Sequence, residues 1–596
     1  MNDSSRRPNF ETILFILAVF LAFALRLVRL GELPLSDDEA RWAMQAFDLT
    51  KGLHPVIGPQ PAYVLLTALA FYVFQASNFA ARLLPALAGA ALVFAPLLFR
   101  DRLGNKTALV LSFGLALEPG LLALSRQAGS PIMVLSAVVF AWGFWRAGNL
   151  RNAGIMMGLA LLSGPALWPG LIGLLIVYFL ARILLPAASD EASSNNDVEV
   201  QPLFDRKKWL TAGAYALGTY LAVGSLFLLA TPGGLSAGLA ALPAYLSGWV
   251  PADATAGVSW AYLPLSLLVY EFFAVALAVI ALVRGAMERD RLVLSLGLWL
   301  LVALIIAIIY PSRQVGDLVW ALIPLWALAA LEFTRYLTPI KDNVWETLAM
   351  TGLTIAILIF ALFSFLTIAI SPLDMNAVAR TVNDLPLIGT ITLTNGQVYW
   401  SVVIGSLLLL AVSVALVGYG WSMNVAIQGA TWGLLAAFVF YTLSASLAAA
   451  NLRTHISQEL WAPGPQTVQA EALVDQMNDL SRWDKGVDSV LDVFVSGIDS
   501  PALHWALRDW NVTYSSAPTL SGTPSFVIGS SQLSAPELTS AYRGQEFTWR
   551  GYPGWDGNSP GDWLRWSMAH SVPRGEEKII LWTRSDIFID ARSLQP

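Results

Sequence analysis

The chain has no cysteine, and only 13% of its 596 residues are charged. Without cysteine it can form no disulfide and no thiolate metal site. Its histidines lie too far apart along the chain to suggest a local zinc motif; they are His54, His455, His504 and His570. Soluble domains carry about 25% charged residues, so the deficit indicates that much of this chain lies in lipid. The net charge of −6 and the lack of a long basic tract give no reason to expect nucleic acid as a partner.

Hydrophobic residues, in contrast, make up 56% of the chain, and they are concentrated in long apolar segments before residue 450. A transmembrane helix needs roughly 20 predominantly apolar residues. Segments near this length are 13–30, 79–99, 106–124, 131–146, 153–165, 167–185, 209–230, 260–284, 291–310, 318–336, 346–370, 398–418 and 424–448. The pattern predicts a multi-spanning α-helical membrane protein with about 13 transmembrane helices.

The basic residues between these segments predict the orientation of the chain. Loops on the cytoplasmic side carry an excess of Lys and Arg. When all of these segments span, the basic clusters fall on one side: Arg6/Arg7, Arg100/Arg102/Lys106, Arg146/Arg151, Arg206/Lys207/Lys208, Arg284/Arg289/Arg291 and Arg335/Lys341. We therefore expect a multi-pass protein of the cell membrane with a cytoplasmic N-terminus and an extracytoplasmic C-terminal domain. The apolar run Pro61 to Gln75 is about 22 Å long as a helix, and we expect it to lie partly embedded on the outer face. The link Ala187 to Val200 is expected to be mobile.

Charged residues and turn formers return to the density of soluble proteins after Asn451, which predicts a domain boundary there. Residues 1–450 then form the transmembrane module and residues 451–596 an extracytoplasmic domain. In the second part, helices are expected near 466–482 and 500–510, and strands near 488–495, 524–529 and 577–583. That order predicts a small layered α/β fold.

The first outer loop contains the most concentrated group of charged residues, Ser36-Asp37-Asp38-Glu39-Ala40-Arg41-Trp42-Ala43. Ser36 and Glu39 fit a capping box, and acids in the first turn of a helix are favoured by its dipole. This is the structural interpretation. The functional interpretation is that three carboxylates beside Arg26, Arg29 and Arg41, where a span leaves the membrane, handle a proton and an anion together.

Several motifs, in order along the chain, resemble those of the GT-C glycosyltransferases, closest to the branch of the protein O-mannosyltransferases and lipid A aminoarabinose transferases. The motifs are Asp38-Glu39-x-Arg41-Trp42-Ala43, Gly52-Leu53-His54-Pro55, Ala80-Ala81-Arg82-Leu83-Leu84-Pro85-Ala86, Ser125-Arg126, Trp260-Ala261-Tyr262-Leu263 with Tyr270-Glu271, and His504-Trp505-Ala506-Leu507-Arg508-Asp509. The resemblance covers nearly the whole chain.

This resemblance implies transfer of a sugar, a hexose or a pentose, from a polyprenyl-phosphate donor to a glycan, lipid or protein acceptor on the outer face of the membrane. Neither a nucleotide sugar nor another cofactor is implied, which agrees with the lack of a P-loop or Rossmann fingerprint. By resemblance, Asp38 is the catalytic base, while Glu39 and Arg41 shape the site.

The resemblance also assigns substrate-binding residues. Arg126 and Arg313 are expected to hold the donor phosphate, although an interfacial Arg often simply snorkels to the membrane surface. His54, Tyr262 and Glu271 complete the expected substrate-binding set. Glu271 lies within an apolar helix, where a charge is costly, and either a structural partner or a substrate contact would account for it.

One element of the family pattern is missing. Relatives place a second acid shortly after the Ser-Arg of the second outer loop, whereas the residues from Ser125 to Pro131 include no acid. Glu118 lies upstream and is expected to cap a helix or to neighbour Arg126. This loss argues against a divalent metal held by acids of two loops. It also keeps an alternative open: a non-catalytic relative that serves as a lipid-linked glycan transport component or as a structural subunit.

Overall fold

The computed structural model describes residues 10–185, 205–227, 233–251, 257–337, 343–370, 376–385, 389–453, 458–462, 464–516, 522–531, 540–570, 572 and 574–588. The basic residues Arg6, Arg7 and Lys341 lie outside the described residues, as do His455 and the whole link from Ala187 to Val200 that was expected to be mobile.

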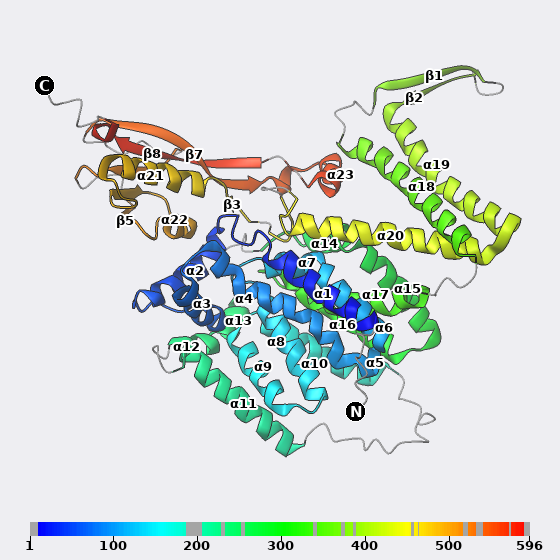
Figure 1. Cartoon of the computed structure of the whole chain (residues 1–596), viewed down its shortest axis with the longest axis horizontal. Coiled ribbons are helices and arrows are strands. Elements are labelled where there is room, and N and C mark those ends of the chain that lie inside the picture. Colours follow the sequence, from blue (N-terminus) through cyan, green and yellow to red (C-terminus); the bar gives the residue numbers. More distant parts are fainter. Residues whose placement is uncertain are drawn as a thin grey trace, which may run out of the picture.

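A bundle of helices forms the first part of the chain (Figure 1). Its elements are α1 (Phe10–Leu27), α2 (Asp37–Thr50), α3 (Pro61–Phe74), α4 (Asn78–Ala91), η1 (Leu92–Phe99), α5 (Arg100–Leu103), α6 (Asn105–Leu117), α7 (Pro119–Ser125), α8 (Ile132–Arg146), α9 (Leu150–Leu162), α10 (Leu167–Leu184), α11 (Arg206–Gly224), α12 (Gly233–Leu239), α13 (Ala241–Ser247), α14 (Tyr262–Tyr270), α15 (Phe272–Glu288), α16 (Arg291–Ile309), η3 (Val315–Leu318), α17 (Val319–Tyr336), α18 (Val344–Ile370), α19 (Asn395–Val417), η4 (Gly418–Ser422) and α20 (Met423–Ala449).

The lengths and composition of these helices are those of a multi-pass membrane protein. Among the described residues, seven helices are long and apolar enough to cross a membrane, or up to nine if each bent pair is one span. Shorter apolar helices include α8 and α9. Each of the apolar segments expected from the sequence contains helix, and the count of about 13 spans stays a prediction.

Two pairs of apolar helices in the described part of the chain are sharply bent, and an acid lies at each bend. α6 and α7 meet at an angle of 53° around Glu118, and α14 and α15 meet at 94° around Glu271. Pro119 follows Glu118, and a proline has no N–H with which to continue the helical hydrogen bonds. Both glutamates are buried, so the breaks place carboxyl groups inside the bundle.

Helix α3 corresponds to the short apolar run that was expected on the outer face. It has 14 residues, and most of them are buried. The hydroxyl of Tyr63 donates to the backbone carbonyl of Ala81 in α4 over 2.8 Å. α3 is therefore held against the bundle by packing, and its position on the outer face stays a prediction.

The C-terminal part is a six-stranded mixed sheet with helices. Its elements are β3 (Gln466–Thr467), α21 (Ala470–Lys485), β4 (Asp492–Ser496), α22 (Pro501–Ala506), β5 (Asn511–Ser515), β6 (Phe526–Ser530), β7 (Tyr542–Pro553), η5 (Trp555–Gly557), α23 (Pro560–Ala569), β8 (Arg574–Arg584) and η6 (Ser585–Phe588). The strand order is β3-β7-β8-β6-β4-β5, with β4 parallel to both of its neighbours and the other pairs antiparallel.

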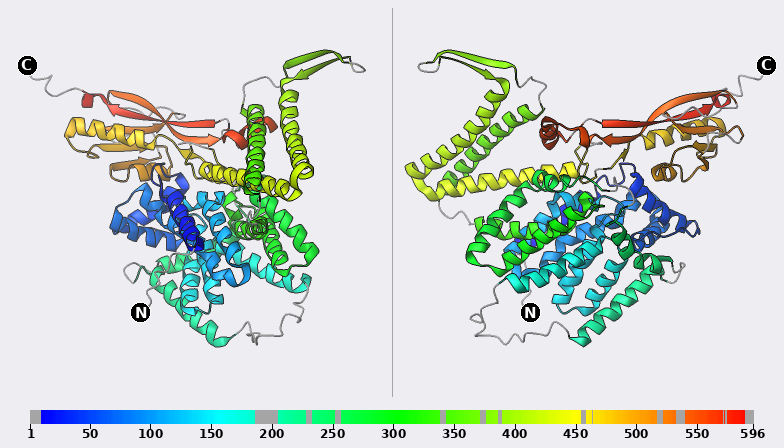
Figure 2. Two further views of the ribbon diagram at one scale, coloured as in Figure 1. Left: turned by 45° about the vertical axis from the view of Figure 1, so that its right-hand side comes forward. Right: turned by 180° about the vertical axis from the view of Figure 1, so that it is seen from behind.

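The sheet domain lies on one side of the bundle, and α22 packs against α2 (Figures 1 and 2). On the same side of the bundle, β1 (Val378–Leu385) and β2 (Gly389–Thr394) form an antiparallel hairpin between α18 and α19. α20 ends at Ala449 and the sheet begins at Gln466. A domain boundary at residue 451 is compatible with these ends and stays a prediction.

Candidate functional site

The site is built on the first turn of α2. Ser36 is the N-cap of this helix: its hydroxyl accepts from the Glu39 amide over 3.4 Å, and the Glu39 carboxylate accepts from the Ser36 amide over 3.1 Å. The capping box expected from the sequence is thus confirmed. It fixes where α2 begins, and therefore the direction in which each following side chain leaves the helix.

The three consecutive acids of this turn point to three different surroundings. Asp37 contacts the C-terminal domain, and Glu39 contacts the bundle. The side chain of Asp38 is 87% exposed. Among the described residues it forms a long ion pair with Arg41, with 3.9 Å between Oδ1 and Nη2. Successive residues of a helix are about 100° apart around its axis, which separates the three carboxylates in this way.

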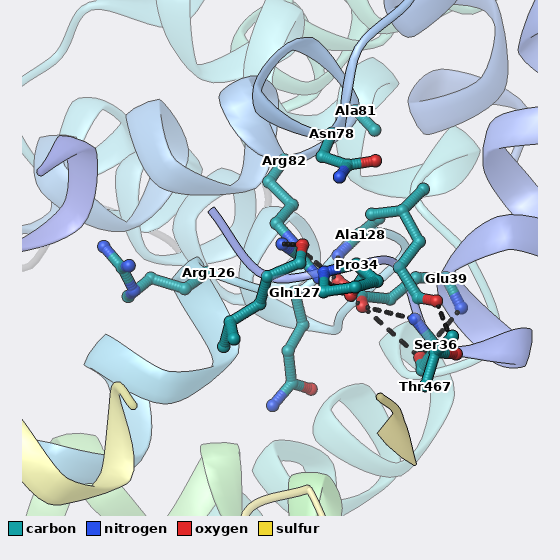
Figure 3. A network of polar contacts seen from close by, with 12 residues as sticks. Pro34, Ser36, Glu39, Asn78, Ala81, Arg82, Arg126, Gln127, Ala128 and Thr467 are labelled. Carbon is teal, nitrogen blue, oxygen red and sulfur yellow. Dashed lines mark hydrogen bonds and ion pairs between the residues drawn. The ribbon is translucent and has the colours of Figure 1, made fainter. Parts of the chain in front are cut away.

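Glu39 ties α2 to two elements of the bundle (Figure 3). Arg82 of α4 donates from Nε and Nη2 to its two carboxylate oxygens, each over 2.7 Å, and the amide of Ala128 in the connection between α7 and α8 donates over 3.0 Å. Burial alone would raise the pKa of Glu39, but the charge of Arg82 and these hydrogen bonds hold the pKa below its ordinary value. Glu39 is therefore an ionised anchor of α2.

Arg82 also shapes the connection between α1 and α2. Its guanidinium donates to the backbone carbonyls of Leu30, Leu33 and Pro34, at distances between 2.8 and 3.2 Å. These carbonyls lie in the connection between α1 and α2. One arginine therefore holds both the loop and the helix that follows it.

The connection between α2 and α3 and the connection between α7 and α8 meet at Trp42. A Cβ atom at Gly58 would lie 2.4 Å from Cζ3 of Trp42, and one at Gly129 would lie 2.4 Å from Cδ1. Gly129 also has a φ of +72°, in the left-handed region that favours glycine. The indole of Trp42 therefore lies between two glycines, and the loops can approach closely only because side chains are absent there.

The side chain of Arg126 is turned toward the end of α1. Its Nη1 donates to the carbonyls of Leu25, Arg26 and Val28, and Nη2 donates to that of Arg29, over 2.8 to 3.2 Å. Figure 3 shows its guanidinium turned away from the Glu39–Arg82 pair. Cations at the last carbonyls of a helix are stabilising, so Arg126 closes the end of α1. Its expected role in phosphate binding stays a prediction.

Arg313 lies in the connection between α16 and α17. Its Nη1 donates to the carbonyl of Tyr310 over 3.2 Å, while its buried Nε has no hydrogen-bond partner among the described residues. Three residues further along the chain, a Cβ atom at Gly316 would lie 3.7 Å from Cγ of Pro131, so the Arg313 segment borders the connection between α7 and α8. A guanidinium with a donor unused is suited to an anion.

The remaining candidates are scattered. His54 is exposed in the connection between α2 and α3. Tyr262 is buried against two tryptophans of the C-terminal domain, with ring centroids 6.2 Å from Trp555 and 5.8 Å from Trp563. The structure therefore brings Asp38, Glu39 and Arg41 onto one helix, with the Arg313 segment bordering the connection that contacts this helix, and it places Tyr262 against the C-terminal domain instead.

Glu271 and Glu118 have structural partners. Glu271 accepts from the indole N–H of Trp326 over 3.0 Å, and Trp326 lines an apolar cavity of about 230 Å³ between α6, α15, α17 and α20. Glu118 caps α7 by accepting from the amides of Gly120 and Leu121. Within the described part of the chain, no group of three or more His, Cys, Asp or Glu side chains is placed to hold a metal ion.

Some residues of the site were not expected as site residues from the sequence. Arg82 carried a signal, because an arginine in an apolar helix is costly and needs a partner. Arg550 and Ser500, which contact Asp37, lie more than 460 positions away in sequence and carry no local signal. They could be found only from the structure.

No protein-family model and no curated protein sequence matches the chain. Among solved structures, the chain is similar to the crystal structure of ArnT from Cupriavidus metallidurans bound to undecaprenyl phosphate. The TM-score is 0.55 at 14% sequence identity, over 96% of this chain and 98% of that one. The chain has the GT-C fold. The apo state of the same ArnT gives a TM-score of 0.52.

The GT-C fold of this chain confirms the architecture that the motifs predicted, including the C-terminal domain. A further similar structure is the Archaeoglobus fulgidus oligosaccharyltransferase in complex with zinc and sulfate. It has a TM-score of 0.42 and 12% identity, over 87% of this chain and 68% of that one.

Proposed function

We propose that this protein transfers a sugar from a polyprenyl-phosphate donor to an acceptor hydroxyl on the outer face of the membrane, with Asp38 as the general base. The observation that carries the proposal is the placement of Asp38. It is the acid of the first turn of α2 that faces outward, on a helix whose two neighbouring acids are both held. The GT-C fold supports the proposal, as does the undecaprenyl phosphate bound to the similar ArnT.

The proposed reaction is a direct displacement at the anomeric carbon of the sugar. The acceptor hydroxyl gives its proton to a carboxylate oxygen of Asp38 while its oxygen bonds to the anomeric carbon. The bond between that carbon and the phosphate oxygen breaks, and its electron pair leaves with the polyprenyl phosphate. A positioned base contributes about 10²–10⁴-fold to such a step, provided that the helix holds it in line with the reacting atoms.

Cations near the site would stabilise the departing phosphate. Arg41 lies one turn beyond Asp38 and is 62% exposed, so it is accessible to a charged substrate. Arg313 offers the unpartnered Nε described above. In this proposal Arg41 and Arg313 share the anion. Arg126 acts indirectly, by closing the end of α1 beside the loop that carries α2.

The proposed topology follows from the same assignment. Asp38, Arg313 and the C-terminal domain all lie on the extracytoplasmic side in this proposal. The N-terminus is cytoplasmic. The acceptor, whether glycan, lipid or protein, approaches from outside. Reporter fusions after Lys106 and after Asn451 test this topology. A cytoplasmic signal at the first position and an external signal at the second are expected, and the reverse at either position contradicts the assignment.

The non-catalytic alternative draws support from Glu118 and Arg126, because both are occupied in capping helices. One experiment distinguishes the two functions. The purified full-length protein in lipid nanodiscs is incubated with synthetic undecaprenyl-phosphate hexoses and pentoses together with glycan, lipid and protein acceptors, and free undecaprenyl phosphate and glycosylated acceptor are measured. Release of the lipid phosphate above a protein-free control supports sugar transfer. Binding of the lipid, seen by native mass spectrometry, without any release supports the non-catalytic alternative.

A further inference from the structure

Asp37 joins the first turn of α2 to the C-terminal domain. Its Oδ1 accepts from the Ser500 hydroxyl over 2.6 Å and from the Ala502 amide over 3.0 Å, and its Oδ2 accepts from Nε of Arg550 over 2.7 Å. Both side chains of the ion pair are largely buried. We propose that Asp37 is a positioning residue through which the C-terminal domain sets the direction of Asp38; this inference rests on the proposed function.

The partners of Asp37 are themselves held in place. The Arg550 guanidinium donates to the Glu577 carboxylate and to the Asp499 carbonyl, each over 3.1 Å. The Ser500 hydroxyl accepts from the indole N–H of Trp549 over 3.0 Å. Burial alone would lower the pKa of Arg550, but the hydrogen bonds and charges of Asp37 and Glu577 outweigh burial and hold this pKa above its ordinary value. Asp37 therefore meets a rigid, charged surface of the sheet domain.

Further contacts fasten the same domain around α2. Thr467 donates to the carbonyl of Leu35 over 2.9 Å, just before the helix begins. The indole N–H of Trp505 donates to Asn78 over 2.8 Å, and its ring packs against Phe47 and Phe71, with centroids 6.2 and 5.6 Å away. The domain thus contacts the start of α2, a residue near its end, and the neighbouring helices α3 and α4.

The two anchors on either side of Asp38 limit the motion of α2. Asp37 and Glu39 are two positions apart, which places their side chains about 200° apart around the helix. A roll of α2 in either direction would break one of the two buried contacts, and breaking a buried charge pair is costly. Asp38 is consequently held by its neighbours rather than by contacts of its own. The C-terminal domain forms one of the two supports.

The test combines kinetics with hydrogen exchange on the full-length protein in nanodiscs. Asp37→Asn keeps an oxygen that can accept from Ser500 and Ala502 but removes the charge that pairs with Arg550. Arg550→Gln removes the other partner and serves as an independent variant. Lys578→Gln is the matched control, because it removes an exposed ion pair with Glu546 in the same sheet.

The expected kinetic result is a turnover number lower by about tenfold or more in Asp37→Asn and Arg550→Gln, since small misplacements of a catalytic group are costly. KM should change little, and Lys578→Gln should match the wild type. Placed in an Asp38→Asn background, Asp37→Asn should lower the residual turnover no further, because residues that act as a unit are not additive. Full additivity would overturn the proposal.

Hydrogen exchange separates this inference from the proposed function. The amides of residues 40–43 should exchange at least tenfold faster in Asp37→Asn than in the wild type. Their exchange rates in Lys578→Gln should equal those of the wild type. Unchanged exchange in Asp37→Asn would overturn the positioning role, whatever the activity. A different outcome would be faster exchange in Asp37→Asn together with no release of undecaprenyl phosphate by the wild type from any sugar donor. That outcome would show that the domain holds α2 in place, and it would overturn the proposed function.

Discussion

Glu39 and Arg82 form a two-pronged ion pair inside the protein. Nε and Nη2 of the guanidinium each donate over 2.7 Å to a separate oxygen of the carboxylate, and the two side chains are only 10% and 7% exposed. The pair joins α2 to α4, and Arg82 adds contacts to the loop before α2. The candidate base Asp38 therefore lies on a helix that is anchored by the buried side chain of the next residue, Glu39.

Replacement of Glu39 by Gln should destabilise the protein strongly. The variant leaves Arg82 buried with no opposite charge, and loss of one partner of a buried pair costs about 3–5 kcal/mol. The free energy of unfolding is measured by denaturant titration in detergent micelles. Glu546→Gln is the control, because its pair with Lys578 is exposed and is worth about 1 kcal/mol or less. Equal losses in the two variants would contradict the importance of the buried pair.

The same pair should make stability depend on pH in the acid range. The pKa of Glu39 lies below its ordinary value of 4.5. Its contribution is therefore fully present above that value and is lost as the pH falls through the lower pKa of the folded protein. The gap in unfolding free energy between wild type and Glu39→Gln should be constant from about pH 7 to 5 and should shrink at more acid pH. A gap that stays constant down to about pH 3 would contradict this.

The contact between the outer loops can be tested at Gly129. Gly129→Ala places a methyl group 2.4 Å from the Trp42 ring at a φ of +72°, whereas Gly148→Ala has a φ of +74° and meets nothing within 4 Å. Both changes cost about 1–2 kcal/mol for the left-handed backbone, and only Gly129→Ala adds an overpacking cost of about 1–3 kcal/mol. Thermal unfolding should rank Gly129→Ala clearly below Gly148→Ala. An equal loss of thermal stability in the two variants would show that the Trp42 ring moves aside without cost.

The two candidate phosphate ligands should behave differently. A charge-assisted contact to phosphate is worth roughly 1.5–3 kcal/mol, so Arg313→Ala should weaken the binding of undecaprenyl phosphate about tenfold or more. Arg126→Ala should mainly lower thermal stability, because its guanidinium is occupied by the end of α1. Binding is measured by titration of the lipid with native mass spectrometry. A larger loss of binding in Arg126→Ala than in Arg313→Ala would reverse the assignment.

The helices of the bundle could be predicted closely because long apolar segments carry a strong signal. The segment expected at 346–370 is the helix Val344–Ile370, and that expected at 291–310 is Arg291–Ile309. The bends within two spans were less visible. Around Glu118 the proline gives a local cue, whereas residues 265–275 include no proline or glycine, so the sequence gives no local cue for the bend at Glu271.

The C-terminal domain was predicted only in part. The expected helix at 466–482 overlaps α21, and the strands expected at 488–495, 524–529 and 577–583 overlap β4, β6 and β8. β7 was missed because its first half, including residues 543–546, is exposed and reads as polar loop. β5 is an edge strand with several exposed residues, and such strands lack the alternation that marks a buried face.

The candidate site was predictable as a local structure but not as an assembly. The capping box of Ser36 and Glu39 spans four residues, so sequence alone sufficed to predict it. The partners of the acids were beyond local reasoning: Arg82 is 43 positions from Glu39, and Arg550 is 513 positions from Asp37. From the sequence, Glu39 is recognisable as a capping residue and Asp38, by resemblance, as the base, but Asp37 has no assigned role. The long-range contacts show that Asp37 and Glu39 are both held, whereas Asp38 is exposed.

The most direct test of the central claim is the rate of sugar transfer by Asp38→Asn. Asparagine keeps the shape of the side chain, and among the described residues the Asp38 side chain is 87% exposed, so its replacement should change stability little. The account predicts unfolding and undecaprenyl phosphate binding equal to those of the wild type, with release of undecaprenyl phosphate from a sugar donor reduced about a hundredfold or more. Full transfer activity in Asp38→Asn would contradict the assignment of Asp38 as the base.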